Sequence, residues 1–281
     1  MIPFEFDYQA PATLQEALAL IESGDRKILA GGMSLVPLMK LRLAAPGEVV
    51  DLARVPNLGG ISEADGVLHI GAMTTHREVE ASPIISAKCP LLAETASHIG
   101  DIQVRNMGTM GGSIAHADPA ADYPAALLAL EAKFRLVSAK SDRTVDAADF
   151  FLEAFTTALE PGEIVLEVTA AVEDASEGHR YEKVAHPASG FAVVGVAARI
   201  RKTGDRITMA RIGVTGMSAK AFRAREAELL LESGATVAQA IATVGQGEEA
   251  NSDLYAAADY RRRLAQVYAG RAIEAALSRA S

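Results

Sequence analysis

The stretch GTMGGSIAHADPAAD, residues 108–122, places three glycines, two hydroxyl residues, a histidine and two aspartates within fifteen positions. It permits three interpretations: a cradle for an anionic group, a metal site formed by His116, Asp118 and Asp122, or a turn. Glycine lets a backbone approach a ligand closely, and consecutive N–H groups can surround an anion. The hydroxyls of Thr109 and Ser113 can donate to phosphate oxygens.

A second glycine loop, Gly31-Gly32-Met33-Ser34, lies between a strand predicted at 27–30 and a helix predicted from Leu35 to Leu43. Ser34 suits the N-cap of that helix, whose first turn would offer N–H groups to an anion. Two such loops could hold a diphosphate from both sides. A single double glycine is more typical of a turn, so the residues alone leave both interpretations open.

Other motifs narrow the chemistry. Neither G-x-G-x-x-G nor G-x-x-x-x-G-K-[ST] occurs, so a Rossmann site and a P-loop are not supported. The spacing of the candidate metal ligands matches no known helical metal motif, and no G-x-S-x-G accompanies Ser113 for a catalytic triad. Cys89 is the one cysteine of the sequence, so cysteine clusters for zinc or iron–sulfur are excluded. We expect its thiol to be buried.

Composition sets the class of protein. The 281 residues, 49% of them hydrophobic, suggest one large or two ordinary globular domains. A net charge of −9 disfavours nucleic acid and anionic membranes as partners. The sequence shows no signal peptide and no run of 18 apolar residues, so we expect no membrane span and a cytoplasmic location.

The pattern of apolar residues predicts an α/β organisation followed by a second domain. A polar stretch at 173–179 marks the boundary. Two long apolar strands follow, at 191–200 and 207–217, joined as a hairpin. The last 60 residues are predicted helical, with an apolar stripe for core packing and an arginine run that lies on a solvated face. The stripe is Leu254, Tyr260, Leu264, Val267, Tyr268 and Leu277, and the run is Arg261–Arg263.

Five ordered stretches then resemble a known family. They are AGGMSLVPLMKLRL (30–43), IGAMTTH (70–76), IGDIQVRNMGTMGGSIAHADPAAD (99–122), LEPGEIVLEV (159–168) and YEKVAHPASGFAVVGVAA (181–198). Together they span essentially the whole chain. The sequence resembles the FAD-binding medium subunits of molybdenum hydroxylases, the carbon monoxide dehydrogenase and xanthine dehydrogenase family.

This resemblance implies an α+β chain. A vanillyl-alcohol-oxidase-type FAD-binding fold would have two α/β subdomains, about 1–57 and 58–176, followed by a C-terminal domain at 177–281 with a small antiparallel sheet and helices. It also implies a heterotrimer, in which a large subunit holds the molybdopterin cofactor and hydroxylates the substrate, and a small subunit holds two [2Fe–2S] clusters. The FAD of the medium subunit would pass electrons to an external acceptor, in a dimer of heterotrimers.

The resemblance also implies the roles of single residues. The first diphosphate loop corresponds to Leu29, Ala30, Gly31, Gly32, Met33, Ser34 and Leu35, and the second to Thr109, Gly111, Gly112 and Ser113. Asp122 matches an acceptor for ribityl or ribose hydroxyls, and Ile99 an apolar residue beside the flavin or adenine. Thr74, Leu166 and Lys183 match positions close to the cofactor. No catalytic residue and no metal ligand are expected in this chain.

Two positions depart from the family pattern. The first loop usually reads Gly-Gly-His-Ser, and here Met33 replaces the histidine, so a strong hydrogen-bond donor is missing. Relatives often carry basic residues followed by Asp-Tyr-Ala where this chain has Ser189-Gly190-Phe191. Phe191 would lack a hydroxyl near the flavin, which bears on the flavin potential and the choice of acceptor.

Two other classes of function are the alternatives. A stand-alone flavin oxidase or dehydrogenase would need a substrate pocket over the ring, for which about 105 residues after the boundary leave little room. A cofactor-free interaction module is disfavoured by the two glycine loops.

Overall fold

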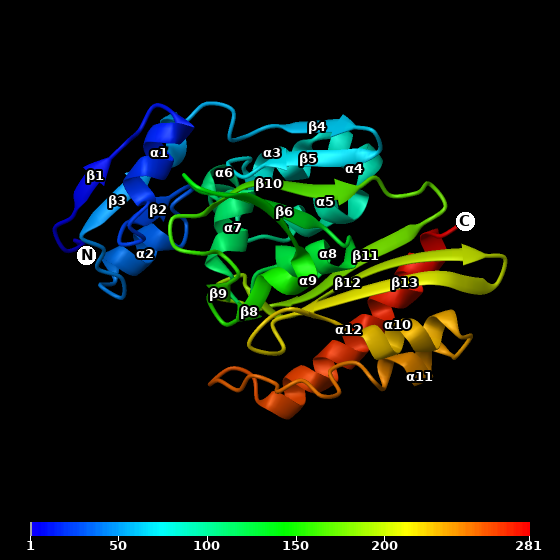
Figure 1. Ribbon diagram of the computed structural model, residues 1–281. Helices are drawn as coiled ribbons and strands as arrows, with labels where there is room; N and C mark the ends of the chain where they lie inside the picture. Colours follow the sequence, from blue (N-terminus) through cyan, green and yellow to red (C-terminus); the bar gives the residue numbers. More distant parts are fainter. Residues whose placement is uncertain (1) are drawn as a thin grey trace.

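A small parallel sheet with two helices forms the N-terminal part of the protein, blue in the computed structural model of Figure 1, which describes residues 2–281. Its strand order is β1 (Asp7–Gln9), β3 (Glu48–Asp51), β2 (Lys27–Leu29), all parallel. The helices are α1 (Leu14–Ile21) and α2 (Leu35–Lys40), and a 3-10 turn, η1 (Leu52–Arg54), follows β3. Helix α1 begins with a capping box of Thr13 and Glu16, which have the T-x-x-E spacing of that motif in the sequence.

The middle of the molecule is a five-stranded antiparallel sheet. Its order is β4 (Ile61–Ala64), β5 (Val67–Gly71), β10 (Ile164–Ala171), β6 (Lys133–Val137), β7 (Asp142–Asp146). In β5 the residues are buried alternately, as expected where one face of a sheet meets the core. Leu68, Ile70 and Phe134 pack there with the helices.

Helices pack against this sheet and lead into the last domain. They are α3 (His76–Ala81), α4 (Pro83–Lys88), α5 (Pro90–Ser97), α6 (Ile102–Met107), α7 (Met110–His116), α8 (Tyr123–Ala129) and α9 (Ala147–Phe150). A short hairpin of β8 (Phe151–Glu153) and β9 (Thr156–Thr157) follows α9. Every residue of α8 is buried, because this helix lies between the middle sheet and the C-terminal sheet.

The C-terminal domain is a four-stranded antiparallel sheet with its own helices, and its strands β12 and β13 are yellow in Figure 1. The strand order is β11 (Gly178–Ala185), β12 (Ala192–Thr203), β13 (Arg206–Thr215), β14 (Phe222–Arg223). Helices α10 (Arg225–Glu232), α11 (Val237–Ile241) and α12 (Ala258–Arg279) pack with it into a second core. The predicted hairpin of β12 and β13 and the predicted α+β class are confirmed. The limits at residues 57 and 176 stay predictions.

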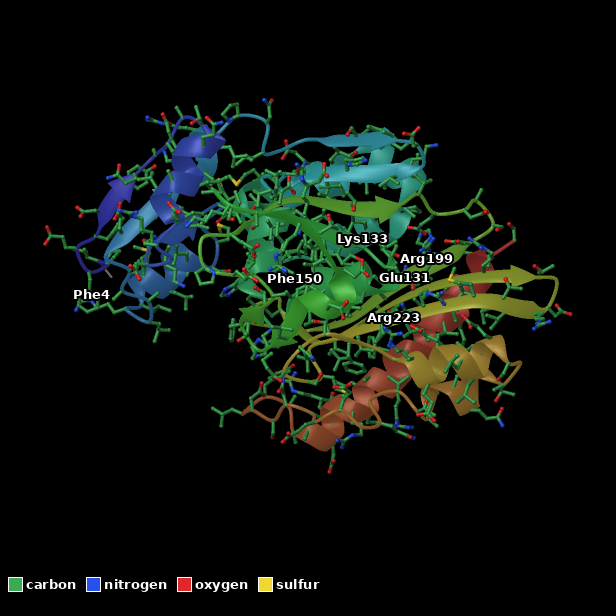
Figure 2. All side chains as sticks on the ribbon, viewed as in Figure 1. Phe4, Glu131, Lys133, Phe150, Arg199 and Arg223 are labelled. Carbon is green, nitrogen blue, oxygen red and sulfur yellow. The ribbon has the colours of Figure 1, made fainter. Side chains whose placement is uncertain are left out.

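Helix α8 packs on β13 without intervening side chains. A Cβ at Gly213 would lie 2.8 Å from the carbonyl carbon of Ala125 and would overlap its oxygen. Beside this contact, Glu131 forms ion pairs with Arg211 at 3.1 Å and Arg223 at 2.8 Å. Figure 2 labels Glu131 and Arg223 at this junction. The two domains therefore meet through close backbone packing and ion pairs. These contacts fix the position of the C-terminal sheet, including β11, relative to the first domain.

Several expectations for the C-terminal helices are wrong. Leu254 and Tyr260 are exposed, whereas Leu264, Tyr268 and Leu277 of the same predicted stripe do pack on the core. Arg261 is buried: it donates to the carbonyls of Val193 and Gly216 and pairs with Asp253. Residues 253–257 belong to the stretch predicted helical, yet α12 begins only at Ala258, because Asp253 accepts from the backbone N–H groups of Tyr255 and Ala256 in a turn. The sequence pattern also predicts neither the short strands β1 and β4 nor the eight-residue strand β11.

Candidate functional site

The two glycine loops lie directly against each other. Gly31 follows β2, and a Cβ there would overlap the carbonyl oxygen of Met107 and lie 2.8 Å from the Cα of Gly108. On the other side of the contact, a Cβ at Gly112 would lie 3.5 Å from the Cβ of Ala30. The two loops thus meet through backbone atoms, with few side chains at the contact. A ligand that approaches a backbone closely requires such a surface.

The first loop offers unused hydrogen-bond donors. Within residues 2–281, the only bonds made by residues 32–34 to the next helix use carbonyls: Gly32 accepts from Val36, and Ser34 accepts from Leu38. The backbone N–H groups of Met33 and Ser34 have no partner in this described part of the chain. Ser34 occupies the N-cap position, but its hydroxyl makes no cap bond. Gly32 adopts a φ of +72°, which suits glycine. These free N–H and O–H groups can serve an anion.

The second loop differs from the expectation. Gly111, Gly112 and Ser113 lie inside α7, whose N-cap is Thr109. The first N–H groups of α7 are already bonded: Met110 donates to Thr74 O at 2.9 Å and Gly111 to Ala72 O at 2.8 Å. The N–H of Gly112 goes to the hydroxyl oxygen of Thr109 at 3.2 Å. These amides are therefore not available to an anion, and the segment can contribute only its glycine-lined surface.

Thr74 connects the second loop to the segment at Gly60, since its carbonyl accepts from Met110 N. Its hydroxyl donates to Gly60 O at 3.1 Å and accepts from Gly60 N at 2.9 Å, and the residue is buried. The imidazole of His76 lies next to Gly108, where a Cβ would be 2.6 Å from its Nε2. Burial, together with nearby Arg105, lowers the pKa of His76 to about 4. His76 is therefore neutral at pH 7 beneath the second loop.

Asp122 is the centre of a buried charged cluster. Its Oδ1 accepts from the hydroxyl of Tyr181 at 2.6 Å, and its Oδ2 accepts from Nζ of Lys183 at 2.9 Å. The lysine also donates to the carbonyl of His98 at 2.8 Å. Burial raises the pKa of Asp122 to about 6, against the opposing effects of Lys183 and Tyr181. Lys183 Nζ also lies 2.9 Å from Oδ1, so Oδ2, which contacts the lysine alone, is the oxygen with a lone pair left for another donor.

The rest of the 108–122 stretch joins the two domains. The carbonyl of Ala120 accepts from Ala192 N at 3.1 Å, and that of Pro119 accepts from Gly216 N at 2.8 Å. The hydroxyl of Thr215 reaches the carbonyls of Pro119 and Ala121. Among residues 2–281, no group of three His, Cys, Asp or Glu side chains could hold a metal ion. The HADPAAD segment thus links the two domains through backbone hydrogen bonds and positions Asp122 next to β11.

The other site candidates lie around these loops. Ile99 is half-buried against the main core, and its carbonyl accepts from Arg105 at 3.0 Å. Leu166 packs between α1 and the middle sheet, at a β-bulge of β10. Phe191 is 42% exposed at the end of a tight turn in which His186 O accepts from Gly190 N. Cys89 is fully buried, as predicted.

The arrangement suits FAD. Donors for a diphosphate occur in the first loop, and a side-chain-free wall stands beside them at Gly31 and Gly112. A carboxylate at the start of α8, Asp122, pairs there with the buried ammonium of Lys183 on β11. Sequence reasoning missed Tyr181. Its spacing of two from Lys183 on a strand, which places both on one face, was the available signal.

Two known protein families match most of the chain. Residues 4–170 match the family described as the FAD binding domain in molybdopterin dehydrogenase, and residues 179–276 match the CO dehydrogenase flavoprotein C-terminal domain. The chain is an FAD-binding medium subunit of the CO dehydrogenase and xanthine dehydrogenase family. Such a medium subunit is a component of an oxidoreductase.

Individual relatives cover the whole of this medium subunit. The carbon monoxide dehydrogenase medium chain of Hydrogenophaga pseudoflava is 39% identical over 285 residues, 99% of each chain. That of Afipia carboxidovorans is 36% identical over all of this chain and 99% of its own length. A solved structure of the H. pseudoflava enzyme, which lacks the Mo-pyranopterin moiety of its molybdenum cofactor, superposes with a TM-score of 0.97 at 41% identity over both full chains. No helix within residues 2–281 is long and apolar enough to cross a membrane.

Proposed function

We propose that this medium subunit transfers electrons within a heterotrimeric molybdenum hydroxylase. It would receive them from the [2Fe–2S] clusters of a small subunit and deliver them to an external acceptor. A large subunit would carry the molybdopterin cofactor and hydroxylate the substrate. The family membership supports this role, because relatives that match the whole chain are named as medium chains of carbon monoxide dehydrogenase. We further propose a dimer of heterotrimers in the cytoplasm, with no nucleic acid partner.

One structural observation supports this placement of the cofactor: the loop that touches the second glycine loop through Ala30 and Gly31 carries unpartnered backbone N–H groups two to three residues further on, at Met33 and Ser34. When bound, FAD supplies a group that accepts electrons singly or in pairs. The residues proposed to hold it are Leu29, Ala30, Gly31, Gly32, Met33, Ser34 and Leu35 of the first loop, Thr109, Gly111, Gly112 and Ser113 of the second, and Thr74, Ile99, Asp122, Leu166 and Lys183 around them.

Different residues would bind different parts of FAD. The first loop binds the diphosphate through N–H groups and the Ser34 hydroxyl. Gly111 lets α7 pack closely on Ala72, since a Cβ there would overlap the Ala72 Cβ. Gly112 would let the ligand approach α7, whose positive end favours an anion although its amides are occupied. Asp122 accepts from a sugar hydroxyl. Lys183 places a cation where negative charge develops when electrons arrive.

Affinity purification from the source cells tests the proposal. We expect a yellow chain that copurifies with a molybdenum-containing large subunit and an iron–sulfur small subunit. A yellow chain that isolates alone and oxidises a small substrate unaided would overturn the subunit role. A colourless chain that takes up no FAD would overturn the cofactor site.

A further inference from the structure

Strand β11 presents a tyrosine and a lysine to the same carboxylate. Tyr181 and Lys183 are two residues apart and so point to the same face of the strand, toward Asp122 at the start of α8. The Tyr181 hydroxyl lies 2.6 Å from Oδ1, and Lys183 Nζ lies 2.9 Å from Oδ2. Gly195 of β12 makes room for the phenol, since a Cβ there would overlap the Tyr181 hydroxyl and lie 2.9 Å from a methyl carbon of Thr215.

Water has little access to this cluster. Tyr181 is fully buried, and the side chains of Lys183 and Asp122 are 2% and 4% exposed. In such surroundings a carboxylate stays ionised only if hydrogen bonds and an opposite charge offset the lost hydration. The structure supplies one of each: the phenol O–H and the ammonium. If either group is removed, the other alone must offset the lost hydration of the carboxylate.

We propose that Tyr181 is a positioning residue of the cofactor site, whose hydroxyl keeps Asp122 ionised and oriented so that it holds the Lys183 ammonium beside the carbonyl of His98. The proposal rests on the proposed placement of Asp122 and Lys183 at the FAD. Tyr181 acts through these two groups, so its loss changes their charge state and leaves the diphosphate loops intact.

Other ionisable groups around the cluster are already engaged or lie further out. Glu94 of α5 accepts from Arg180 at 2.7 Å and from the backbone N–H of Tyr181 at 3.1 Å. Glu182 of β11 accepts from Arg180 at 2.7 Å. Glu80 of α3 is paired with Arg105 at 3.0 Å. The imidazole of His98, near Tyr181, is the remaining group able to titrate near neutral pH, and burial lowers its pKa.

The chain contains a matched control for the tyrosine. Tyr123 follows Asp122 directly and is fully buried, yet its hydroxyl has no hydrogen-bond partner within residues 2–281. Tyr181→Phe and Tyr123→Phe therefore remove the same atom from equally buried rings next to the same carboxylate. Only the first removes a bond to Asp122.

The test is the pH dependence of FAD affinity in the full chain, measured by quenching of flavin fluorescence. Wild-type affinity should fall as the pH falls through about 6, where Asp122 takes up a proton. Tyr181→Phe should move this midpoint upward by about one pH unit, because a hydrogen bond to the charged form is lost. Tyr123→Phe should keep the wild-type midpoint. His98→Gln removes the imidazole but keeps the backbone carbonyl, and the step must persist in it.

Equal midpoints for Tyr181→Phe and Tyr123→Phe would overturn the inference, and so would a wild-type affinity without any step near pH 6. Failure of the wild-type chain to bind FAD would instead overturn the proposed cofactor site. If Tyr181→Phe does not fold, Asp122→Asn replaces it. That variant should bind FAD with the low-pH affinity at every pH, and a retained step would overturn the inference.

Discussion

Gly31→Ala should push apart the two glycine loops of the proposed FAD site. The new Cβ would overlap the carbonyl oxygen of Met107 and lie 2.8 Å from the Cα of Gly108. Ordinary contacts require about 3.5 Å or more between such carbon atoms. Both neighbours are backbone atoms, so no side chain can rotate away, and the loop at 30–34 must move back by several tenths of an ångström or more.

The energetic cost follows from this displacement. Overpacking of a well-packed contact costs about 1–3 kcal/mol. If FAD needs the native spacing of the loops, binding must recover that energy, and the affinity should fall by roughly 5–150-fold. The same contact joins the N-terminal sheet to the middle domain, so the free energy of unfolding should fall by a similar amount.

Isothermal titration of the purified chain with FAD gives the affinity, and thermal unfolding without FAD gives the stability. Gly47→Ala is the matched control, because no atom lies within 4 Å of a Cβ at Gly47 in the same subdomain. The reasoning is refuted if Gly31→Ala binds FAD as tightly as Gly47→Ala and unfolds at the same temperature.

Three further variants test other parts of the site. Gly112→Val should abolish stoichiometric FAD, since its Cβ would lie 2.7 Å from the hydroxyl oxygen of Thr109 and its methyls would fill the approach to α7; a flavin spectrum of normal intensity would contradict this. Asp122→Ala should weaken FAD binding by about 1–3 kcal/mol and lower the free energy of unfolding by about 3–5 kcal/mol, because Lys183 loses its buried partner; an unchanged Kd would count against the acceptor role. His76 has a folded pKa of about 4 against 6.5 when unfolded, so the unfolded state binds the extra proton and stability is lost as the pH falls from about 6.5 to 4. This loss of stability is about 3 kcal/mol. His76→Leu should abolish the loss when the free energy of unfolding is measured by denaturant titration at several pH values. The same dependence of that free energy on pH in wild type and variant would contradict the lowered pKa of His76.

Features that depend on neighbouring residues in the sequence could be predicted. The capping boxes at Thr13 and Thr75 formed as the spacing to Glu16 and Glu78 indicated. The hairpin of β12 and β13 followed from two long apolar runs around a short polar turn. The two glycine loops were found for the same local reason. The direct backbone contact between the two loops could not be predicted from either loop alone.

Features that depend on distant residues could not be predicted. The partners of Asp122 lie 59 and 61 positions along the chain. The N–H groups of Met110 and Gly111 looked free because their acceptors, Thr74 and Ala72, belong to another loop. Strand β1 contains only exposed residues, so it carries no apolar alternation. Its pairing with β3 was therefore absent from the hydrophobic pattern.

The most direct test of the electron-transfer role follows the visible flavin absorption under anaerobic conditions. The chain alone and the copurified complex are each mixed with the substrate of the complex and observed before any acceptor is added. We predict that the flavin bleaches in the complex and recovers when an acceptor is added, whereas the isolated chain stays oxidised. Bleaching of the isolated chain by that substrate, or a complex whose flavin stays oxidised while substrate is consumed, would contradict the account.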